Sequence, residues 1–187
     1  MNTASIGAFH VARDGEAGPL RGAVVAIGNF DGVHRGHRAV IGAALTRAKA
    51  LGRKAAALTF SPHPRRFLRP QDTLFQLSSE RDRLRLLAAT GLDGAIVMHF
   101  DAALAATSAE DFIEKILVAR FGVGAAAIGF DFHFGKNRAG SPESWNNVSC
   151  GRRNSRGCGV KVKAAVLAAV LRPSACARFC AAAMTAR

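Results

Sequence analysis

The sequence predicts an α/β domain built on a mainly parallel sheet. Short apolar segments rich in Val, Ile and Ala alternate with segments of helical periodicity, and turns that contain glycine join them. The length of 187 residues suits one main domain. With 49% hydrophobic and 21% charged residues, the chain can bury a core and is too apolar for global disorder. We therefore expect a folded α/β protein.

The first half of this pattern contains two strands and a long helix. Residues 22–28 (GAVVAIG) are a short apolar run, which predicts the first strand. A helix is expected over residues 36–51, with Gly52 as its stop. Residues 54–60 (KAAALTF) predict the second strand.

A proline-containing segment and a capped helix follow the second strand. Pro62, Pro64 and Pro70 predict a long loop without a regular helix, because proline cannot donate a backbone hydrogen bond. Ser79, with Asp82 three residues later, resembles a loose capping box and predicts the start of the next helix.

The alternation continues to about residue 130. The helix that starts near Ser79 is expected to end at Gly91, and residues 95–100 (AIVMHF) predict the third strand. Ser108 opens another helix, and residues 125–129 (AAAIG) predict the fourth strand.

Charge and cysteine content divide the chain near residue 142. The net charge of +13 would suit an anionic partner such as nucleic acid or a polyphosphate. Residues 142–187 contain eight of the 26 Lys and Arg, one of the 13 Asp and Glu, and all four cysteines. We therefore expect a domain at residues 1–141 and a basic, cysteine-containing tail of doubtful structure at residues 142–187.

The tail cysteines do not form a recognisable metal or disulfide pattern. They are Cys150, Cys158, Cys176 and Cys180. Structural zinc sites pair ligands two to four residues apart at both ends of a loop, and only the last pair fits that spacing. A disulfide framework is rare in the cytosol. The sequence therefore favours free thiols and no metal site, with zinc as a weak alternative and a disulfide framework as a weaker one.

The expected location is the cytoplasm. No apolar run approaches the length of about 18 residues that a membrane span needs. The N-terminal segment shows no basic region followed by an apolar one, as a secretory signal would. We therefore expect no membrane partner, whereas the sequence does not predict an oligomeric state.

The segment with the clearest chemistry is GNFDGVHRGH, residues 28–37, between the first strand and the first helix. Ligands of doubly wound sheets bind beyond the carboxyl ends of the strands, where this turn would lie. His34 and His37 are three residues apart, so they share a face of the helix's first turn, and Gly36 leaves no side chain between them. The N–H groups of a helix N-terminus favour bound phosphate, and paired imidazoles can stabilise charge that develops on it.

The histidine pair has two other interpretations. A pair of histidines at this spacing is more often incidental, although the glycine-rich turn between strand and helix favours function. The pair could instead bind a metal. The other histidines of the chain, however, are not spaced to supply a third ligand. These histidines are His10, His63, His99 and His133.

Two further motifs follow predicted strands: TFSPHPR at residues 59–65 and GFDFHFGKNRAG at residues 129–140. Together with HRGH at residues 34–37, which matches the HxGH motif, they resemble the FAD synthetase (FMN adenylyltransferase) module of bacterial bifunctional riboflavin kinase/FAD synthetases. That family lies in the nucleotidylyltransferase superfamily. The resemblance spans about residues 20–141.

The resemblance implies a Rossmann-like nucleotidylyltransferase domain that transfers AMP from ATP to FMN and gives FAD and pyrophosphate, with Mg²⁺. The FMN phosphate attacks the α-phosphorus directly, so positioning and charge stabilisation supply the rate. His34 and His37 are the implied catalytic residues. ATP and FMN are the implied partners, and nucleic acid is not one.

The resemblance also implies a set of binding residues. Asn29 and Asp31 would shape the nucleotide-binding turn, while His63, Arg65 and Asp131 would line the joint substrate site. An alternative role for His63 is to shape its loop alone. The implied binding residues are Gly28, Asn29, Phe30, Asp31, Gly32, Gly36, His63, Arg65, Gly129, Asp131 and Phe132.

The sequence departs from the family after Ser141. The superfamily's second phosphate-binding signature, I/V-S-S-T/S-x-x-R, has no counterpart in these 187 residues, and we expect the riboflavin kinase module to be absent. We therefore expect a domain incomplete at its C-terminal end, with impaired or lost activity. A frameshift near codons 140 to 145 is our hypothesis for the tail; a natural short variant is the competing one.

Two other functions stay open at this point. One is a nucleotidylyltransferase with a different phosphorylated acceptor. The other is a basic nucleic-acid-binding protein, which is disfavoured because the chain has no Tyr and one Trp to stack on bases.

Overall fold

The computed structural model describes residues 9–13, 17–142, 145 and 169–171. The four cysteines lie outside these residues, as does most of the tail to which the frameshift and missing-signature hypotheses apply.

The described residues form one sheet of six strands, all parallel. The α/β class with a parallel sheet is therefore confirmed. From one edge to the other the strands are β1 (His10–Ala12), β4 (Gly94–His99), β3 (Ala55–Ser61), β2 (Val24–Ile27), β5 (Ala125–Gly129) and β6 (Ala169–Leu171).

The four predicted strands correspond to β2, β3, β4 and β5, with bounds shifted by at most two residues at either end. The two edge strands β1 and β6 were not predicted. Each has three residues, which is too short for a periodic pattern to show, and β6 lies in the segment expected to be a tail of doubtful structure.

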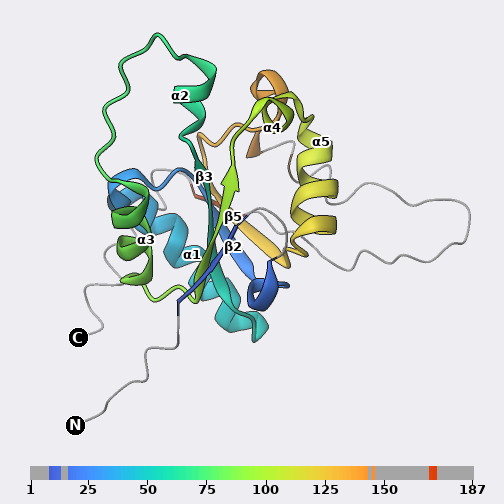
Figure 1. The fold of residues 1–187 in the computed structure, drawn as a ribbon. Helices are drawn as coiled ribbons and strands as arrows, with labels where there is room; N and C mark the ends of the chain where they lie inside the picture. Colours follow the sequence, from blue (N-terminus) through green and yellow to red (C-terminus); the bar gives the residue numbers. More distant parts are fainter. Residues whose placement is uncertain (1–8, 14–16, 143–144, 146–168, 172–187) are drawn as a thin grey trace, which may run out of the picture.

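Helices cover both faces of the sheet (Figure 1). On one face lie α1 (Arg35–Leu51) and α3 (Glu80–Ala88); on the other lies α5 (Ala109–Asp111), which continues as the π-helix η3 (Phe112–Arg120). The predicted caps are confirmed, because Ser79 and Ser108 accept hydrogen bonds from backbone N–H groups three residues later. Shorter helices are η1 (Gly18–Leu20), η2 (Asp31–Val33), α2 (Pro64–Leu68), α4 (Ala102–Ala106) and η4 (Lys136–Arg138).

The prediction of no regular helix after the second strand was wrong. Residues Pro64–Leu68 form α2, a helix of five residues. Pro64 occupies its first turn, where a backbone N–H has no helical partner and proline is tolerated. His63 caps the helix, so the prolines bound this short helix instead of excluding it.

Alternate residues of the central strands pack into two separate cores. In β2, Val24 and Ala26 join the core beneath α1 and α3, whereas Val25 and Ile27 join the core beneath α5 and η3. Such two-sided burial is typical of parallel sheets and explains why these strands are continuously apolar.

The strand order creates a switch point beside β2. The chain leaves β2 for β3 on one side, and later returns to pair β5 on the other side. Loops that follow β2 and β5 therefore diverge and leave a crevice at the carboxyl ends of these strands. In the described part of the chain, no helix is long and apolar enough to cross a membrane.

Candidate active site

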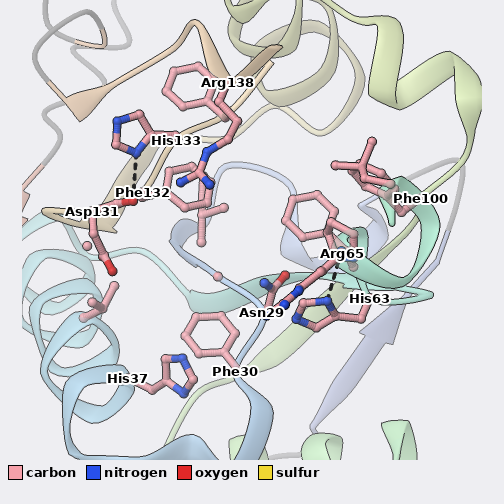
Figure 2. Close-up of a pocket in the computed structure, with 18 of the residues that line it drawn as sticks. Asn29, Phe30, His37, His63, Arg65, Phe100, Asp131, Phe132, His133 and Arg138 are labelled. Atoms are coloured by element: carbon pink, nitrogen blue, oxygen red, sulfur yellow. Dashed lines mark hydrogen bonds between the residues drawn. The ribbon is translucent and has the colours of Figure 1, made fainter. Parts of the chain in front are cut away.

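A cavity of about 1390 Å³ lies at the carboxyl ends of the central strands (Figure 2). Its walls come from the connections that follow β2, β3, β4 and β5. All residues that the sequence predicted for the site line this cavity except Asp31 and Gly32. Those that line it are Gly28, Asn29, Phe30, His34, Gly36, His37, His63, Arg65, Gly129, Asp131 and Phe132.

The two histidines of the HRGH motif lie side by side. The ring centroids of His34 and His37 are 3.6 Å apart, and the ring planes differ by 22°. A Cβ atom on Gly36 would lie 3.2 Å from Cε1 of His34, so glycine at this position leaves room for the ring. The two rings thus share one face of the first turn of α1, as their spacing predicts.

His34 caps α1. Its Nδ1 accepts a hydrogen bond of 3.4 Å from the backbone N–H of His37. A ring nitrogen that accepts a hydrogen bond carries no proton, so the neutral His34 ring holds its proton on Nε2. The Nε2–H group is therefore the one that His34 can offer to a ligand.

His37 is uncharged at neutral pH. Burial and, to a smaller extent, nearby His34 lower its pKa from 6.5 to about 4, against the opposing effect of the Asp31 and Asp131 carboxylates. Its Nδ1 is buried and has no hydrogen-bond partner within the described residues. A neutral imidazole has one donor and one acceptor nitrogen, so His37 can bind a phosphate oxygen as a dipolar donor.

The turn that leads into α1 has a strained backbone. Phe30, Gly32 and Val33 have φ angles of 53°, 69° and 40°, in the left-handed region. A β-branched residue such as valine rarely adopts this region, and strain of this kind persists only where the surroundings over-determine it. Phe30 and Val33 are both buried in the core beneath α1, which holds the turn in place.

Asp31 fixes this turn from outside the cavity. Its carboxylate accepts hydrogen bonds from the backbone N–H groups of Leu77 (2.9 Å) and Ser78 (2.8 Å) and from the Ser78 hydroxyl (2.7 Å). Burial raises the pKa of Asp31, but these hydrogen bonds and the His63 ring outweigh burial and lower it overall. The N–H of Gly32 also donates to Ser78 Oγ, at 3.1 Å. Asp31 and Gly32 therefore tie the turn to the loop before α3 and do not form the cavity wall.

The second motif supplies the wall at the start of α2. The Nδ1 of His63 accepts a hydrogen bond from the N–H of Arg65 at 3.1 Å, so His63 caps the helix and also lines the cavity. Burial lowers the pKa of His63, as do Arg83 and Arg65, against an opposing effect of Asp31. The Arg65 guanidinium is ion-paired with Asp72 at 3.2 Å, on the rim of the cavity.

The third motif divides between the cavity and the core. Asp131 and Phe132 line the cavity, and the Nδ1 of His133 lies 2.9 Å from the backbone oxygen of Asp131. Phe134 is buried and packs against Phe132, with ring centroids 5.7 Å apart, and against Trp145 at 5.0 Å. Phe134 thus packs in the core and also borders the cavity, whereas Phe130 is 50% exposed.

An aromatic end of the cavity was missed by the sequence analysis. Phe100 lies edge-on to Phe60, with centroids 6.0 Å apart, and edge-on to Phe67 at 5.7 Å. These residues come from β3, α2 and the turn after β4, so no local pattern connects them. Further apolar lining residues at the cavity are Leu68, Leu104, Ala105 and Phe112.

A buried arginine behind the cavity wall was also missed. The side chain of Arg83, in α3, is 4% exposed and donates to the backbone oxygens of Asn29 and Phe60, each at 3.2 Å. Burial lowers its pKa, although Glu80 and Asp31 oppose the shift. Arg83 thus joins the chain segments that follow β2 and end β3. In the sequence it is one arginine of a charged helix, with no signal that separates it from its exposed neighbours.

Comparison with known proteins identifies the family. The FAD synthetase family model matches residues 17–163. The chain belongs to the FAD synthetase family. The match includes all three motifs and runs beyond the last of them, which ends at Gly140.

Curated members of the FAD synthetase family are similar to the N-terminal part of this chain. The bifunctional riboflavin kinase/FMN adenylyltransferase of Pseudomonas fluorescens is 39% identical over 120 residues, which cover 64% of this chain and 38% of that protein. The protein of the same description from Escherichia coli K12 is 37% identical and covers 65% and 39%. The putative bifunctional enzyme of Geobacillus thermodenitrificans is 40% identical, with 65% of each chain covered. The chain thus spans about two fifths of the first two relatives.

A solved structure supports the fold of this family member. The crystal structure of a macrolide-efflux protein from Streptococcus pneumoniae superposes with a TM-score of 0.63 at 22% identity. The superposition covers 75% of this chain and 48% of that one. At this identity the likeness concerns the fold alone.

The lowered pKa of His37 predicts a pH dependence of stability. The unfolded chain binds a proton on His37 below about pH 6.5, whereas the folded chain binds it only near pH 4. Folding stability should therefore fall as the pH decreases through this window, and it should fall less in His37→Gln. Urea unfolding at pH 7.0 and 4.5 measures the difference. Thr46→Ala, a non-titrating change in the same helix, should keep the full decrease; equal decreases in all three proteins would contradict the shift.

The two carbonyl contacts of Arg83 predict a specific loss of stability. In Arg83→Lys a single ammonium replaces the planar fork and leaves at least one carbonyl without its donor. We expect a loss of about 1–3 kcal/mol in the free energy of unfolding. The matched control is Arg85→Lys in the same helix, whose ion pair with Asp82 is exposed and should change stability by less than about 0.5 kcal/mol. Equal effects would show that Arg83 does not hold the two segments together.

Proposed function

We propose that this chain is an FMN adenylyltransferase, which transfers AMP from ATP to FMN and forms FAD and pyrophosphate. The observation that carries the proposal is one continuous cavity with two chemically different ends. The stacked histidines and the start of α1 form a polar end, and the Phe60 and Phe100 rings form an aromatic end. The names of the curated relatives agree with this assignment.

The polar end suits a triphosphate. The N–H groups and dipole of the first turn of α1 favour negative charge. The Nε2–H of His34 and the neutral ring of His37 add hydrogen-bond donors at the same place. Because the strained turn is held by Asp31 and by core packing, these donors are in position before a ligand binds.

The aromatic end suits the ring system of FMN. Phe100, Leu104 and Phe112 are apolar lining residues of the cavity, and Figure 2 shows Arg65 and His63 between Phe100 and His37. A flat, apolar flavin ring gains both burial and aromatic contact there. This end favours FMN over a small phosphorylated acceptor, and a cavity of this volume suits either small molecule better than an extended nucleic acid.

The reaction needs no protein nucleophile. An oxygen of the FMN phosphate attacks the α-phosphorus of ATP, the bond from that phosphorus to the bridging oxygen breaks, and pyrophosphate leaves with the electron pair. His34 and His37 donate hydrogen bonds to phosphate oxygens whose charge grows in the transition state. The remaining residues of the cavity orient the two substrates and exclude water.

The residues present fit a magnesium ion that is held mainly by substrate. No cluster of three or more His, Cys, Asp or Glu side chains in the described segments could hold a metal by itself. Mg²⁺ commonly binds through one or two carboxylates together with substrate phosphates, and Asp131 places one carboxylate in the cavity wall. When bound, the ion would neutralise phosphate charge. Because ATP is made inside the cell, we place the reaction in the cytoplasm.

Formation of FAD tests the proposed function directly. The chain, incubated with ATP, FMN and Mg²⁺, should form FAD and pyrophosphate, measured by chromatography of the flavins. His37→Ala removes a preorganised donor and should lower turnover about 100-fold or more. Arg38→Ala, the adjacent exposed residue outside the cavity lining, is the control and should retain activity. Absence of FAD at high enzyme concentration, from a chain that unfolds cooperatively, would refute the proposal.

The aromatic end can be tested separately. Phe100→Ala removes one wall of the expected flavin site, and the KM for FMN should rise about 3- to 10-fold while the KM for ATP stays within a factor of two. Phe75→Ala is the matched control, since Phe75 is 83% exposed and does not line the cavity. A rise in the KM for ATP alone would contradict this division of the cavity.

A further inference from the structure

A closed turn carries a cationic side chain to the cavity from the wall that follows β5. Phe134 and Gly140 pair as an antiparallel bridge, with N–H to oxygen distances of 3.1 and 2.9 Å in the two directions. The residues between them form the turn η4 (Lys136–Arg138). The bridge fixes both ends of the turn, so the residues at its tip keep a fixed position relative to one another.

The base of this turn is anchored in the protein core. Phe134 is 6% exposed and packs against Trp145 and Phe112. The backbone N–H of Lys136 donates to the oxygen of Thr107 at 2.7 Å. A Cβ atom on Gly135 would lie 2.6 Å from the backbone nitrogen of Ala109, so the turn lies directly against the start of α5.

The backbone at the tip is in an unfavourable conformation. Asn137 and Arg138 have φ angles of 56° and 57°, in the left-handed region that non-glycine residues seldom occupy twice in succession. Such strain persists where the surrounding structure imposes it, and it is concentrated at binding sites. Here the anchored base imposes it, and the consequence is that Asn137 and Arg138 both line the cavity.

The Arg138 side chain is available for a ligand. It has no hydrogen bond or ion pair with any part of the chain that the structure describes, whereas Arg65 is paired with Asp72. Figure 2 shows the Arg138 guanidinium beside Phe132, on the side of the cavity opposite His37. Lys136, in the same turn, does not line the cavity.

We propose that Arg138 is a phosphate-binding residue that contacts the triphosphate of ATP from the wall opposite His34 and His37. The inference rests on the proposed function, because it needs a nucleotide bound across the switch point. The acceptor phosphate and the triphosphate repel each other, and His37 contributes a dipole without a full charge. A guanidinium supplies that charge, together with a planar pair of donors that matches phosphate oxygens. The Asp131 carboxylate on the same wall adds negative charge near the triphosphate, and the Arg138 guanidinium offsets that charge.

The test compares three variants of the full chain. Arg138→Met removes the charge and the donors, Arg138→Lys keeps the charge without the fork, and Lys136→Met removes the same charge from the same turn outside the cavity. Titration calorimetry with a non-hydrolysable ATP analogue, and separately with FMN, measures binding; FAD formation gives KM and kcat. Melting temperatures verify that each variant is folded.

Arg138→Met should weaken binding of the ATP analogue about 10- to 100-fold, with FMN binding within a factor of two. Arg138→Lys should lie between this variant and the unmodified chain, and Lys136→Met should change binding less than about threefold. Equal effects of Arg138→Met and Lys136→Met, or weakened FMN binding with ATP binding intact, would overturn the assignment of Arg138 alone. If the unmodified chain neither bound the analogue nor formed FAD, the proposed function would fail and this inference with it.

Discussion

The switch point beside β2 is the constraint on which the candidate site depends. Because β2 pairs with β3 on one side and with β5 on the other, the connections after β2 and β5 leave the sheet in different directions. A crevice at this place is a property of the topology and needs no particular side chain. Side chains decide what the crevice binds, and the three motifs are the segments that border it.

On both sides of the crevice the protein holds a strained turn by contacts from elsewhere in the sequence. The turn before α1 depends on Asp31 and the loop at Ser78, and the turn at Asn137 depends on the Thr107 carbonyl and the packing of Phe134. Strain at the site is thus offset by hydrogen bonds and burial outside it. This arrangement keeps donors fixed at the cavity without requiring a ligand to order them, which is the condition for electrostatic stabilisation of a transition state.

Local patterns in the sequence were enough to predict the central strands and the main helices, and 11 of the residues predicted for the site line the cavity. They succeed where one segment carries its own signal, as in the capping by Ser79 or the pairing of His34 with His37. They fail where a role arises only when distant segments meet. Arg83 is indistinguishable from exposed arginines until the fold brings it to two backbone carbonyls, and Phe100 gains its role from Phe60 and the helix α2. The helix α2 escapes such patterns because proline disfavours a helix interior but is tolerated in the first turn, where Pro64 lies.

The charge distribution of the cavity follows from how each group is held. Desolvation at the base of the cavity favours the neutral form of His37, so a full positive charge placed there would be costly before ligand binds. Guanidinium groups on the more exposed rim remain hydrated, so the desolvation cost of their positive charge is smaller there. The cavity therefore has a neutral, preorganised floor at His37 and a cationic rim, and this arrangement is stable without a ligand. The two proposed anionic substrates would balance the positive charge of the rim, so that the binding of one affects the binding of the other.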